Sequence, residues 1–144
     1  MNVKLLKVKQ NAVVPTYGSP DSAGADLYSA DETLVIEPNE TVMVHTGIAI
    51  ELPKGYAGLI YARSGLASKR GLAPANKVGV IDPDYRGEIM VALHNHSSLP
   101  QTVEAGERIA QLVVTPFIQA DFEVSDTLSE TERGAGGFGS TGTK

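Results

Sequence analysis

The chain has no cysteine and no tryptophan among its 144 residues. The absence of cysteine excludes disulfides and metal sites built from thiolates. The N-terminal segment, MNVKLLKVKQ, lacks the long apolar run that a signal peptide or a membrane span requires. We therefore expect a cytoplasmic protein that does not insert into a membrane.

Arginine is scarce, with five residues, and the formal net charge is −5. An acidic chain of this kind lacks the broad basic surface that follows a phosphate backbone, so we expect no nucleic acid polymer as a partner. Glycine-containing segments nevertheless include or adjoin Arg63, Arg86, Arg108 and Arg133. Any bound anion must therefore meet a local cluster.

The hydrophobic pattern is that of β-strands in one domain. A chain of this length with 42% hydrophobic residues can bury a single core. Short or alternating apolar runs, separated by turn residues, predict strands at residues 3–8, 34–36, 42–52, 56–62, 78–81, 89–94 and 109–114. An all-β sandwich or barrel follows.

One short helix is predicted in the segment RSGLASKRG. Ser64 is the expected N-cap, Lys69 and Arg70 suit the last turn, and Gly71 suits the left-handed residue that ends a helix. A serine-capped helix start beside Arg63 can bind an anion, although the same residues also form ordinary capped turns.

The segment RIAQLVV is apolar on both faces of a strand, except at Gln111. Burial on both faces indicates a contact between subunits. A buried amide without a partner costs about 1–3 kcal/mol, so Gln111 needs one. A backbone group and a ligand phosphate both remain open as that partner.

The segment GVIDPDYRGE predicts a β-hairpin whose chemistry lies at its tip. Asp82 ends the first strand, where its carboxylate can accept a proton from water, whereas Asp84 lies in the turn and serves the backbone. Tyr85 either packs in the hairpin or forms the floor of a sugar pocket. Asp26, in AGADLYSA, is flanked by small residues that leave room for a ligand, although this context is also typical of turns.

The last twelve residues, RGAGGFGSTGTK, contain five of the fifteen glycines and cannot form a core. One interpretation is a solvated, flexible end. The other is a segment that orders on a nucleotide polyphosphate, with Arg133 for phosphate oxygens, Phe138 for a base, and hydroxyls at Ser140 and Thr141.

Taken in order, AGADLYSA, ARSGLA, GVIDPDYRGE, GERIAQLVV and RGAGGFGSTG resemble the five motifs of the trimeric dUTP pyrophosphatase (dUTPase) family. The resemblance covers residues 23–142. Ala62 stands where many members have proline, and Ala135 stands where serine is frequent in the tail. Neither position carries the chemistry that the resemblance implies.

The resemblance implies a distorted jelly-roll β-barrel over residues 1–125 and a flexible C-terminal arm over residues 126–144. It also implies a homotrimer in which each active site is assembled from three chains. Such enzymes hydrolyse dUTP to dUMP and pyrophosphate with magnesium, which clears dUTP from the nucleotide pool and supplies dUMP for dTMP synthesis.

The resemblance also implies a role for individual residues. Asp82 is the general base and also holds the sugar 3′-hydroxyl, Tyr85 packs under the deoxyribose, and Asp26 contacts magnesium through a bound water. Magnesium keeps several waters, so no dense ligand cage is expected and the three histidines need no metal role. The implied substrate-binding residues are Arg63, Ser64, Gly65, Asn76, Gly79, Val80, Ile81, Tyr85, Gln111, Arg133, Phe138, Gly139, Ser140 and Thr141.

Two alternatives remain open from the sequence. A dCTP deaminase of the same fold would lack the complete glycine-rich tail and would need a different acid–base residue at the cytosine amine. A non-catalytic module could use the fold to bind a protein or a nucleotide, and the presence of Asp82 argues against it.

Overall fold

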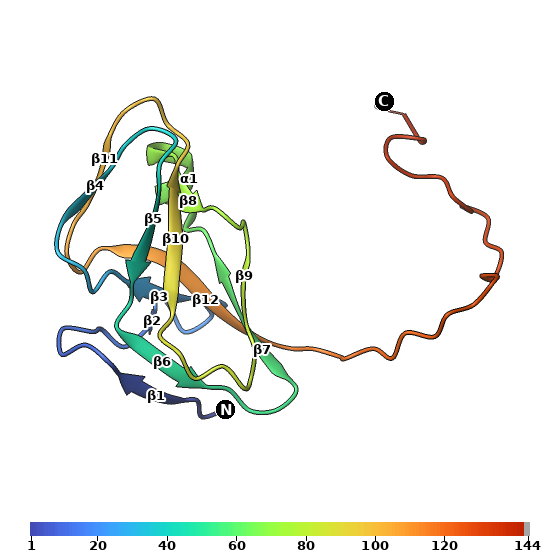
Figure 1. Ribbon diagram of the computed structural model, residues 1–144, viewed down its shortest axis with the longest axis horizontal. Helices are drawn as coiled ribbons and strands as arrows, with labels where there is room; N and C mark the ends of the chain where they lie inside the picture. The colour runs from blue at the N-terminus through green and yellow to red at the C-terminus, as the bar shows by residue number, and fades with distance from the viewer. Residues whose placement is uncertain (143–144) are drawn as a thin grey trace.

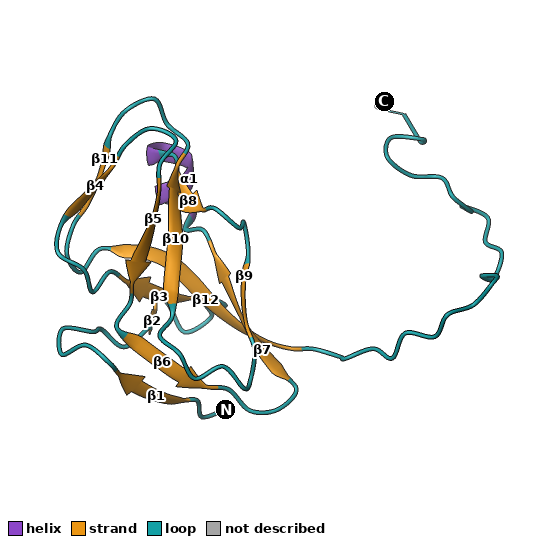
Figure 2. Cartoon of the chain, in the orientation of Figure 1, coloured by secondary structure: helices purple, strands orange, loops and turns teal. Residues whose placement is uncertain are grey.

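The computed structural model describes residues 1–142, so Thr143 and Lys144, at the end of the expected arm, lie outside the described residues. The described chain is all-β with one short helix (Figure 1 and Figure 2). Its elements are β1 (Lys4–Lys7), β2 (Thr16–Tyr17), β3 (Ala25–Tyr28), β4 (Leu34–Ile36), β5 (Thr41–His45), β6 (Ile48–Glu51), β7 (Tyr56–Tyr61), α1 (Ser64–Arg70), β8 (Leu72–Pro74), β9 (Gly79–Ile81), β10 (Met90–Asn95), β11 (Gln101–Val103) and β12 (Arg108–Pro116).

The strands form four antiparallel sheets that enclose one core in a jelly-roll arrangement. The largest sheet has the order β2-β3-β12-β7-β9, so β9 lies at its edge. The smaller sheets are β5-β10-β8, β1-β6 and β11-β4. The core consists of aliphatic side chains that are fully buried, among them Leu27, Ile36, Val44, Ile48, Leu72, Ile89, Leu93, Val103 and Ile109.

The seven predicted apolar runs all form strands, but the run at residues 42–52 forms two. It breaks at Gly47, whose φ is 70° and where a Cβ would lie 2.8 Å from the Cβ of Ala12. Only glycine fits a left-handed position this crowded. Strands β2, β3, β8 and β11 were not predicted, because Thr16, Asp26, Pro74 and Gln101 interrupt any apolar run in these short segments.

The predicted hairpin at residues 79–88 is wrong. β9 pairs with β7, whereas β10 pairs with β5 and β8, so the two strands lie in different sheets. The tight turn between them does form, because the Tyr85 N–H donates to the Asp82 carbonyl at 3.1 Å. Beyond it, however, the chain crosses to the corner between β5 and β6, where the Ile89 N–H donates to the Ile48 carbonyl at 2.8 Å.

The predicted helix is confirmed as α1, together with its C-terminal end, but its predicted N-cap is not. Gly71 is left-handed, with φ at 66°, and its N–H donates to the carbonyls of Ala67 and Leu66. Lys69 and Arg70 occupy the last turn. The prediction of Ser64 as N-cap is wrong: Arg63 occupies that position, without a side-chain cap, and Ser64 is the first helical residue. The Ser64 carbonyl instead accepts a hydrogen bond from the Ser68 hydroxyl at 2.6 Å.

β12 is buried on both faces over its first half, as the sequence predicted. Ile109 points to one face and Ala110 and Leu112 to the other, and all three are buried. Val113 and Val114 are only half-buried in the single chain. The subunit contact that this burial indicated stays a prediction.

Beyond β12 the chain leaves the barrel (Figure 1). The Phe117 N–H donates to the Gly55 carbonyl at 3.0 Å, and the following residues to 142 are exposed and form only local turns. The expected division between barrel and arm at residue 125 stays a prediction. Within residues 1–142, no helix has the length and apolar character that crossing a membrane requires.

Candidate functional site

Two strands and the start of α1 place oppositely charged side chains around one cleft. The Asp26 Oδ1 accepts from the Arg63 Nε at 2.9 Å, and its Oδ2 accepts from the Arg108 Nη1 at 3.2 Å. Asp26 is the second residue of β3, so the alternative of a turn at this position is wrong. The cleft, which we call the anion cleft, has a volume of about 380 Å³ and is lined by Gly18, Ser22, Ala23, Gly24, Asp26, Arg63, Ser64, Gly65, Arg108 and Gln111.

Gln111 joins this cleft from β12, directly opposite Asp26 in the sheet register. Its Nε2 donates to the Ala62 carbonyl at 2.8 Å, so the backbone partner left open by the sequence is the one found. Two guanidinium groups against one carboxylate leave the cleft with a net positive charge. A small anion with several oxygens matches that charge and the available donors.

A second cleft lies beside the turn that follows β9. The Asp82 cleft, as we call it, has a volume of about 620 Å³ and is lined by Glu51, Leu52, Pro53, Lys54, Asp82, Pro83, Asp84, Arg86, Phe117 and Gln119. Asp84 lies in the turn, as predicted. Within residues 1–142, no side chain hydrogen-bonds or pairs with the Asp82 carboxylate, so its oxygens can accept from water.

The turn is fixed largely by its own residues. Arg86 Nη1 donates to the carbonyls of Pro83, at 2.7 Å, and of Tyr85, at 3.1 Å. This contact was not predicted, because nothing in the sequence shows that an arginine bonds its own loop. Arg86 therefore contributes to the shape of the turn that carries Asp82.

An apolar groove of about 230 Å³ continues from Asp82 along the exposed edge of β9, lined by Met43, Val80, Ile81, Asp82, Tyr85, Glu88 and Met90. The Tyr85 hydroxyl donates to the Glu88 carbonyl at 2.9 Å. Asn76 lies beside Gly79: a Cβ on Gly79 would be 3.5 Å from the Asn76 amide nitrogen. The structure thus groups Asn76, Gly79, Val80, Ile81, Asp82 and Tyr85, as the sequence predicted.

One chain does not bring the two clefts together. Gln111 of β12 is opposite Tyr61 of β7. Ile81 of β9 is opposite Gly58 of the same β7, so β9 lies two strands away from β12. Strand spacing and rise put the Cα atoms of Gln111 and Asp82 roughly 15 Å apart. The clefts share no lining residue. A ligand that contacts both sets of groups within one chain must therefore span this distance.

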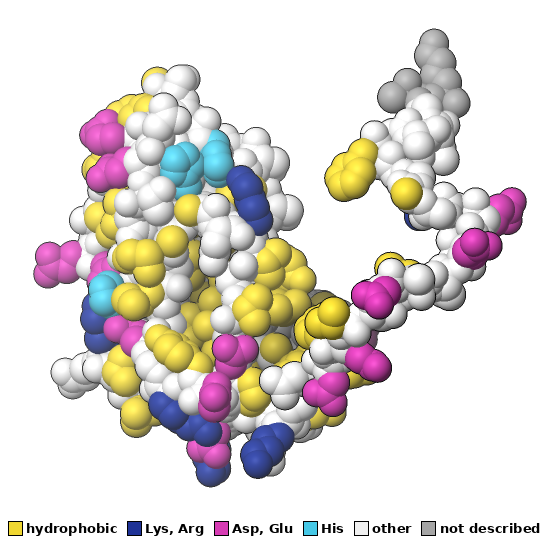
Figure 3. Space-filling view, turned by 45° about the vertical axis from the view of Figure 1, so that its right-hand side comes forward, with side chains coloured by type: hydrophobic (Ala, Val, Ile, Leu, Met, Phe, Trp, Pro, Cys, Tyr) yellow, Lys and Arg dark blue, Asp and Glu magenta, His cyan; other side chains and the backbone are white. Residues whose placement is uncertain are grey.

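The predicted binding residues of the arm are exposed and reach neither cleft of their own chain (Figure 3). These are Arg133, Phe138, Gly139, Ser140 and Thr141. Phe138 and Gly139 are left-handed, with φ at 49° and 89°, and the Ser140 N–H closes a turn on the Gly137 carbonyl at 3.0 Å. The ring of Phe138 is therefore presented to solvent on a local turn.

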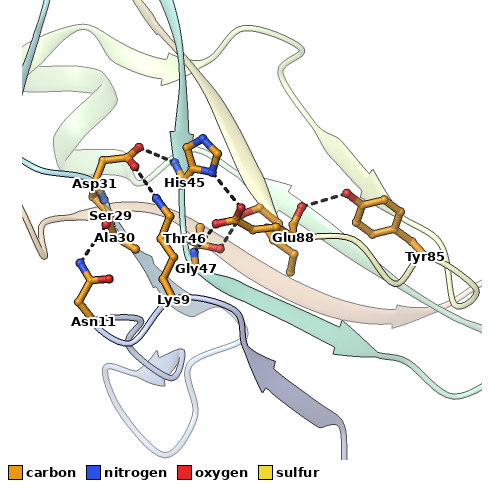
Figure 4. A network of polar contacts seen from close by, with 11 residues as sticks. Lys9, Asn11, Ser29, Ala30, Asp31, His45, Thr46, Gly47, Tyr85 and Glu88 are labelled. Carbon is orange, nitrogen blue, oxygen red and sulfur yellow. Dashed lines mark hydrogen bonds and ion pairs between the residues drawn. The ribbon is translucent and has the colours of Figure 1, made fainter.

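A polar network that the sequence did not predict joins Glu88, in the groove wall, to the body of the barrel (Figure 4). The Glu88 carboxylate accepts from the Gly47 N–H at 2.8 Å and contacts the His45 Nδ1 at 2.9 Å. The Asp31 carboxylate accepts from the His45 N–H and from Lys9, each at 2.8 Å. Burial alone would raise the pKa of Asp31, but the bonds from Lys9 and His45 and the charge of Lys9 outweigh it and hold that pKa below its usual value.

The other two histidines lie together at the end of β10. The ring centroids of His94 and His96 are 4.4 Å apart, and the His94 Nδ1 contacts the Thr41 hydroxyl at 2.7 Å. Burial, followed by the charges of His94 and Lys77, lowers the pKa of His96. No three His, Asp or Glu side chains gather to hold a metal ion within the described chain.

Comparison with known proteins gives a consistent result. A model of the dUTPase family matches residues 10–142. The deoxyuridine 5′-triphosphate nucleotidohydrolase of Desulfitobacterium hafniense is 52% identical over 146 residues, which cover 99% of this chain and 97% of the relative. That of a Hydrogenobaculum species is 47% identical over 144 residues, the full length of both chains.

Solved structures show the same fold. The dUTPase of Staphylococcus bacteriophage 80alpha with dUpNHpp superposes with a TM-score of 0.92 at 30% identity, covering 99% of each chain. A mutant dUTPase from phage phi11 of S. aureus, described with a structural Mg(II) ion, superposes with a TM-score of 0.83 at 25% identity, over 90% of this chain and 100% of the phage chain. The chain belongs to the dUTPase family, and it is by that membership a dUTP diphosphatase with the family's all-β fold.

Proposed function

We propose that the chain hydrolyses dUTP to dUMP and pyrophosphate with Asp82 as the general base, and so removes dUTP and supplies dUMP for dTMP synthesis. The observation that carries the proposal is the Asp82 carboxylate, which directly follows β9 beside the groove and has no side-chain partner within residues 1–142. The related phage enzyme was solved with dUpNHpp, an analogue of dUTP.

In the proposed step, Asp82 takes a proton from a water molecule as that water attacks the α-phosphorus in line. A bond forms between the water oxygen and the α-phosphorus, and the bond from the α-phosphorus to the bridging oxygen breaks. Pyrophosphate leaves with the electron pair of that bond. A positioned general base of this kind contributes on the order of 10²–10⁴ in rate.

Base recognition is assigned to the backbone of β9. Because β9 lies at the edge of its sheet, one side of its backbone pairs with β7 and the other faces the groove. Gly79, Val80 and Ile81, with Asn76 beside them, can therefore pair with uracil as another base would. A site that leaves its polar groups unpaired with the wrong base discriminates by roughly 10⁴-fold or more.

Sugar recognition is assigned to Tyr85 and to Asp82. The ring of Tyr85 lines the same groove as Asp82, three residues further along the chain. There it can pack under the deoxyribose and exclude a 2′-hydroxyl. Asp82 also holds the 3′-hydroxyl. Both residues belong to the same loop, so the sugar and the attacking water are positioned together.

Phosphate binding is assigned to the anion cleft and to the arm. Arg63, Ser64, Gly65 and Gln111 lie together in that cleft. Arg63 uses its Nε for Asp26, which leaves its two terminal amino groups to face a phosphate. The arm, assigned to residues 126–144, closes over the nucleotide: Arg133 binds the γ-phosphate, Phe138 covers the uracil, and Gly139, Ser140 and Thr141 contact the phosphate end.

The residues present fit magnesium held mainly by the substrate. Magnesium retains several waters and takes phosphate oxygens, so it needs few protein ligands. Asp26 has two oxygens, each with one arginine contact, which leaves lone pairs to accept from a metal-bound water. When bound, magnesium would supply charge neutralisation at the triphosphate, and Asp26 would orient the waters around it.

A homotrimer with shared sites resolves the separation of the two clefts. The anion cleft of one chain and the Asp82 cleft of another can face one nucleotide, although they are roughly 15 Å apart within one chain. The exposed arm reaches away from its own barrel and is free to complete a site elsewhere in the trimer (Figure 1).

Pyrophosphate release from dUTP, dCTP, dTTP and UTP, measured side by side, tests the proposal. We expect release from dUTP to be at least 10³-fold faster, by kcat/KM, than from dCTP, whose base edge differs, and about 10²-fold faster than from UTP and dTTP, which each carry one added group. Ammonia release from dCTP would show a deaminase, and tight dUTP binding without turnover would show a binding module. Either result would overturn the proposed function.

A further inference from the structure

The side chain of Glu88 connects the loop that carries Asp82 and Tyr85 to the body of the barrel. Its Oε1 accepts from the Gly47 N–H at 2.8 Å, and its Oε2 contacts the His45 Nδ1 at 2.9 Å. Both partners belong to the corner between β5 and β6 (Figure 4). This corner is rigid, because Gly47 is packed against Ala12 in a left-handed conformation.

The backbone of the same residue holds Tyr85. The Glu88 carbonyl accepts the Tyr85 hydroxyl at 2.9 Å, and the ring lies so close to Gly87 that a Cβ there would overlap it. Figure 4 shows the two halves of Glu88 pointing to opposite sides, the carboxylate to the corner and the carbonyl to the tyrosine. One residue therefore sets where the phenol ring lies relative to the barrel.

Few other contacts tie this loop down. The bonds of Arg86 and of the Tyr85 N–H stay inside the loop, and residues 82, 84, 85 and 86 are exposed. Within the described residues, the loop is otherwise anchored at its two ends: β9 pairs with β7 up to Ile81, and the backbone of Ile89 bonds Ile48 and Thr46. Loss of the Glu88 carboxylate would leave the Glu88 backbone free to shift. Tyr85 would shift with it, because its hydroxyl bonds the Glu88 carbonyl.

We propose that Glu88 is a positioning residue for sugar selectivity, which rests on the proposed function of Tyr85. By fixing the Glu88 carbonyl, its carboxylate keeps the Tyr85 ring where a ribose 2′-hydroxyl would clash. Rejection of an added hydroxyl by shape alone is limited to about 10²-fold, so it depends on rigid placement. The selectivity for dUTP over UTP is therefore set partly by how Glu88, at the groove wall, is fixed to the barrel.

The chain offers a matched control in Glu107. Its carboxylate likewise accepts from a backbone N–H, that of Glu104 at 2.9 Å, and pairs with a basic side chain, Arg70. The exposed fractions of the two side chains are also alike, at 20% for Glu88 and 22% for Glu107. Glu88→Ala and Glu107→Ala therefore remove equivalent contacts, and only the first contact supports Tyr85.

The experiment measures kcat/KM for dUTP and for UTP in the wild type and in three variants, with Tm recorded for each. We expect the dUTP-to-UTP ratio to fall about tenfold in Glu88→Ala. We expect it to stay at the wild-type value in Glu107→Ala, although both variants lose a comparable amount of Tm. Glu88→Gln should restore the ratio, because its amide oxygen can still accept from the Gly47 N–H.

A wild-type ratio in Glu88→Ala, or an equal fall in Glu107→Ala, would overturn the proposal. If Glu88→Ala does not fold, Tyr85→Phe decides, since it removes only the hydroxyl that Glu88 accepts. A lowered ratio there supports the link, and an unchanged ratio overturns it. A wild type that releases no pyrophosphate from dUTP would refute the proposed function itself, whereas an active wild type with an unaltered Glu88→Ala ratio would refute this inference alone.

Discussion

Gly24 lies against Gln111 so closely that a methyl group on Gly24 would overlap the Gln111 Oε1 and lie 3.2 Å from its Cβ. Gly24→Ala should therefore push the Gln111 amide away from the Ala62 carbonyl that it bonds. We expect a loss of about 1–3 kcal/mol in the free energy of unfolding. We also expect a rise in the KM for dUTP, measured by steady-state pyrophosphate release, because Gln111 lines the anion cleft.

Gly18→Ala is the matched control for that substitution. Gly18 lines the same cleft, but a Cβ there would meet only the Ser22 hydroxyl, at 3.8 Å. This variant should keep the wild-type Tm. An equal loss of Tm in the two variants would show that the cleft tolerates no added methyl group anywhere and that Gln111 is not the cause.

Sharing of sites between chains predicts complementation between two inactive variants. Asp82→Asn and Arg63→Ala alter the two separate clefts, and each alone should have little activity. After co-refolding at equal amounts, about one quarter of the shared sites should combine an intact Asp82 with an intact Arg63 from another chain. Pyrophosphate release should recover to that fraction of the wild-type rate. No recovery would place both residues in a site within one chain.

The Lys9–Asp31–His45 contacts predict an acid-dependent contribution to stability. Because the pKa of Asp31 is lowered in the folded chain, its contribution is present above the usual value of 3.8 and is lost as the pH falls through the folded pKa. Asp31→Asn should cost about 1 kcal/mol at pH 7 and progressively less below pH 3.8. Urea unfolding at several pH values measures this difference.

Asp21→Asn serves as the control for that series, because Asp21 is exposed. It should leave the unfolding free energy unchanged across the same pH range. A difference between wild type and Asp31→Asn that persists undiminished at the lowest pH would contradict the assignment of this contribution to the Asp31 carboxylate.

The arm can be followed by fluorescence, because the chain has no tryptophan. Phe138→Trp should change its emission when dUpNHpp and magnesium bind, since the ring moves from solvent to a base. Phe122→Trp, exposed nearer the barrel, should not respond. An unchanged emission of the Phe138→Trp variant at saturating nucleotide would exclude the proposed stacking contact.

Much of this arrangement can be read from the sequence, because local patterns determine it. The apolar runs predicted seven strand regions, and Gly71 predicted the end of the helix. Residues of one short segment were also grouped correctly: Val80, Ile81, Asp82 and Tyr85 line one groove.

Long-range pairing could not be predicted in the same way. Nothing local distinguishes β9 pairing with β10 in a hairpin from β9 pairing with β7, which lies about 20 residues earlier. The contacts of Asp26 with Arg108 and of Glu88 with Gly47 likewise join residues far apart in the chain. The two clefts share no lining residue in one chain, so a site assembled from both belongs to the proposal of a homotrimer.

Single-turnover hydrolysis of dUTP by Asp82→Asn tests most directly whether Asp82 is the general base. Asp84→Asn is the control from the same turn. Asp82→Asn should bind dUpNHpp about as tightly as the wild type and hydrolyse dUTP on the order of 10²–10⁴-fold more slowly. Asp84→Asn should hydrolyse it at close to the wild-type rate. Near-wild-type turnover by Asp82→Asn would contradict the assignment of Asp82 as the general base.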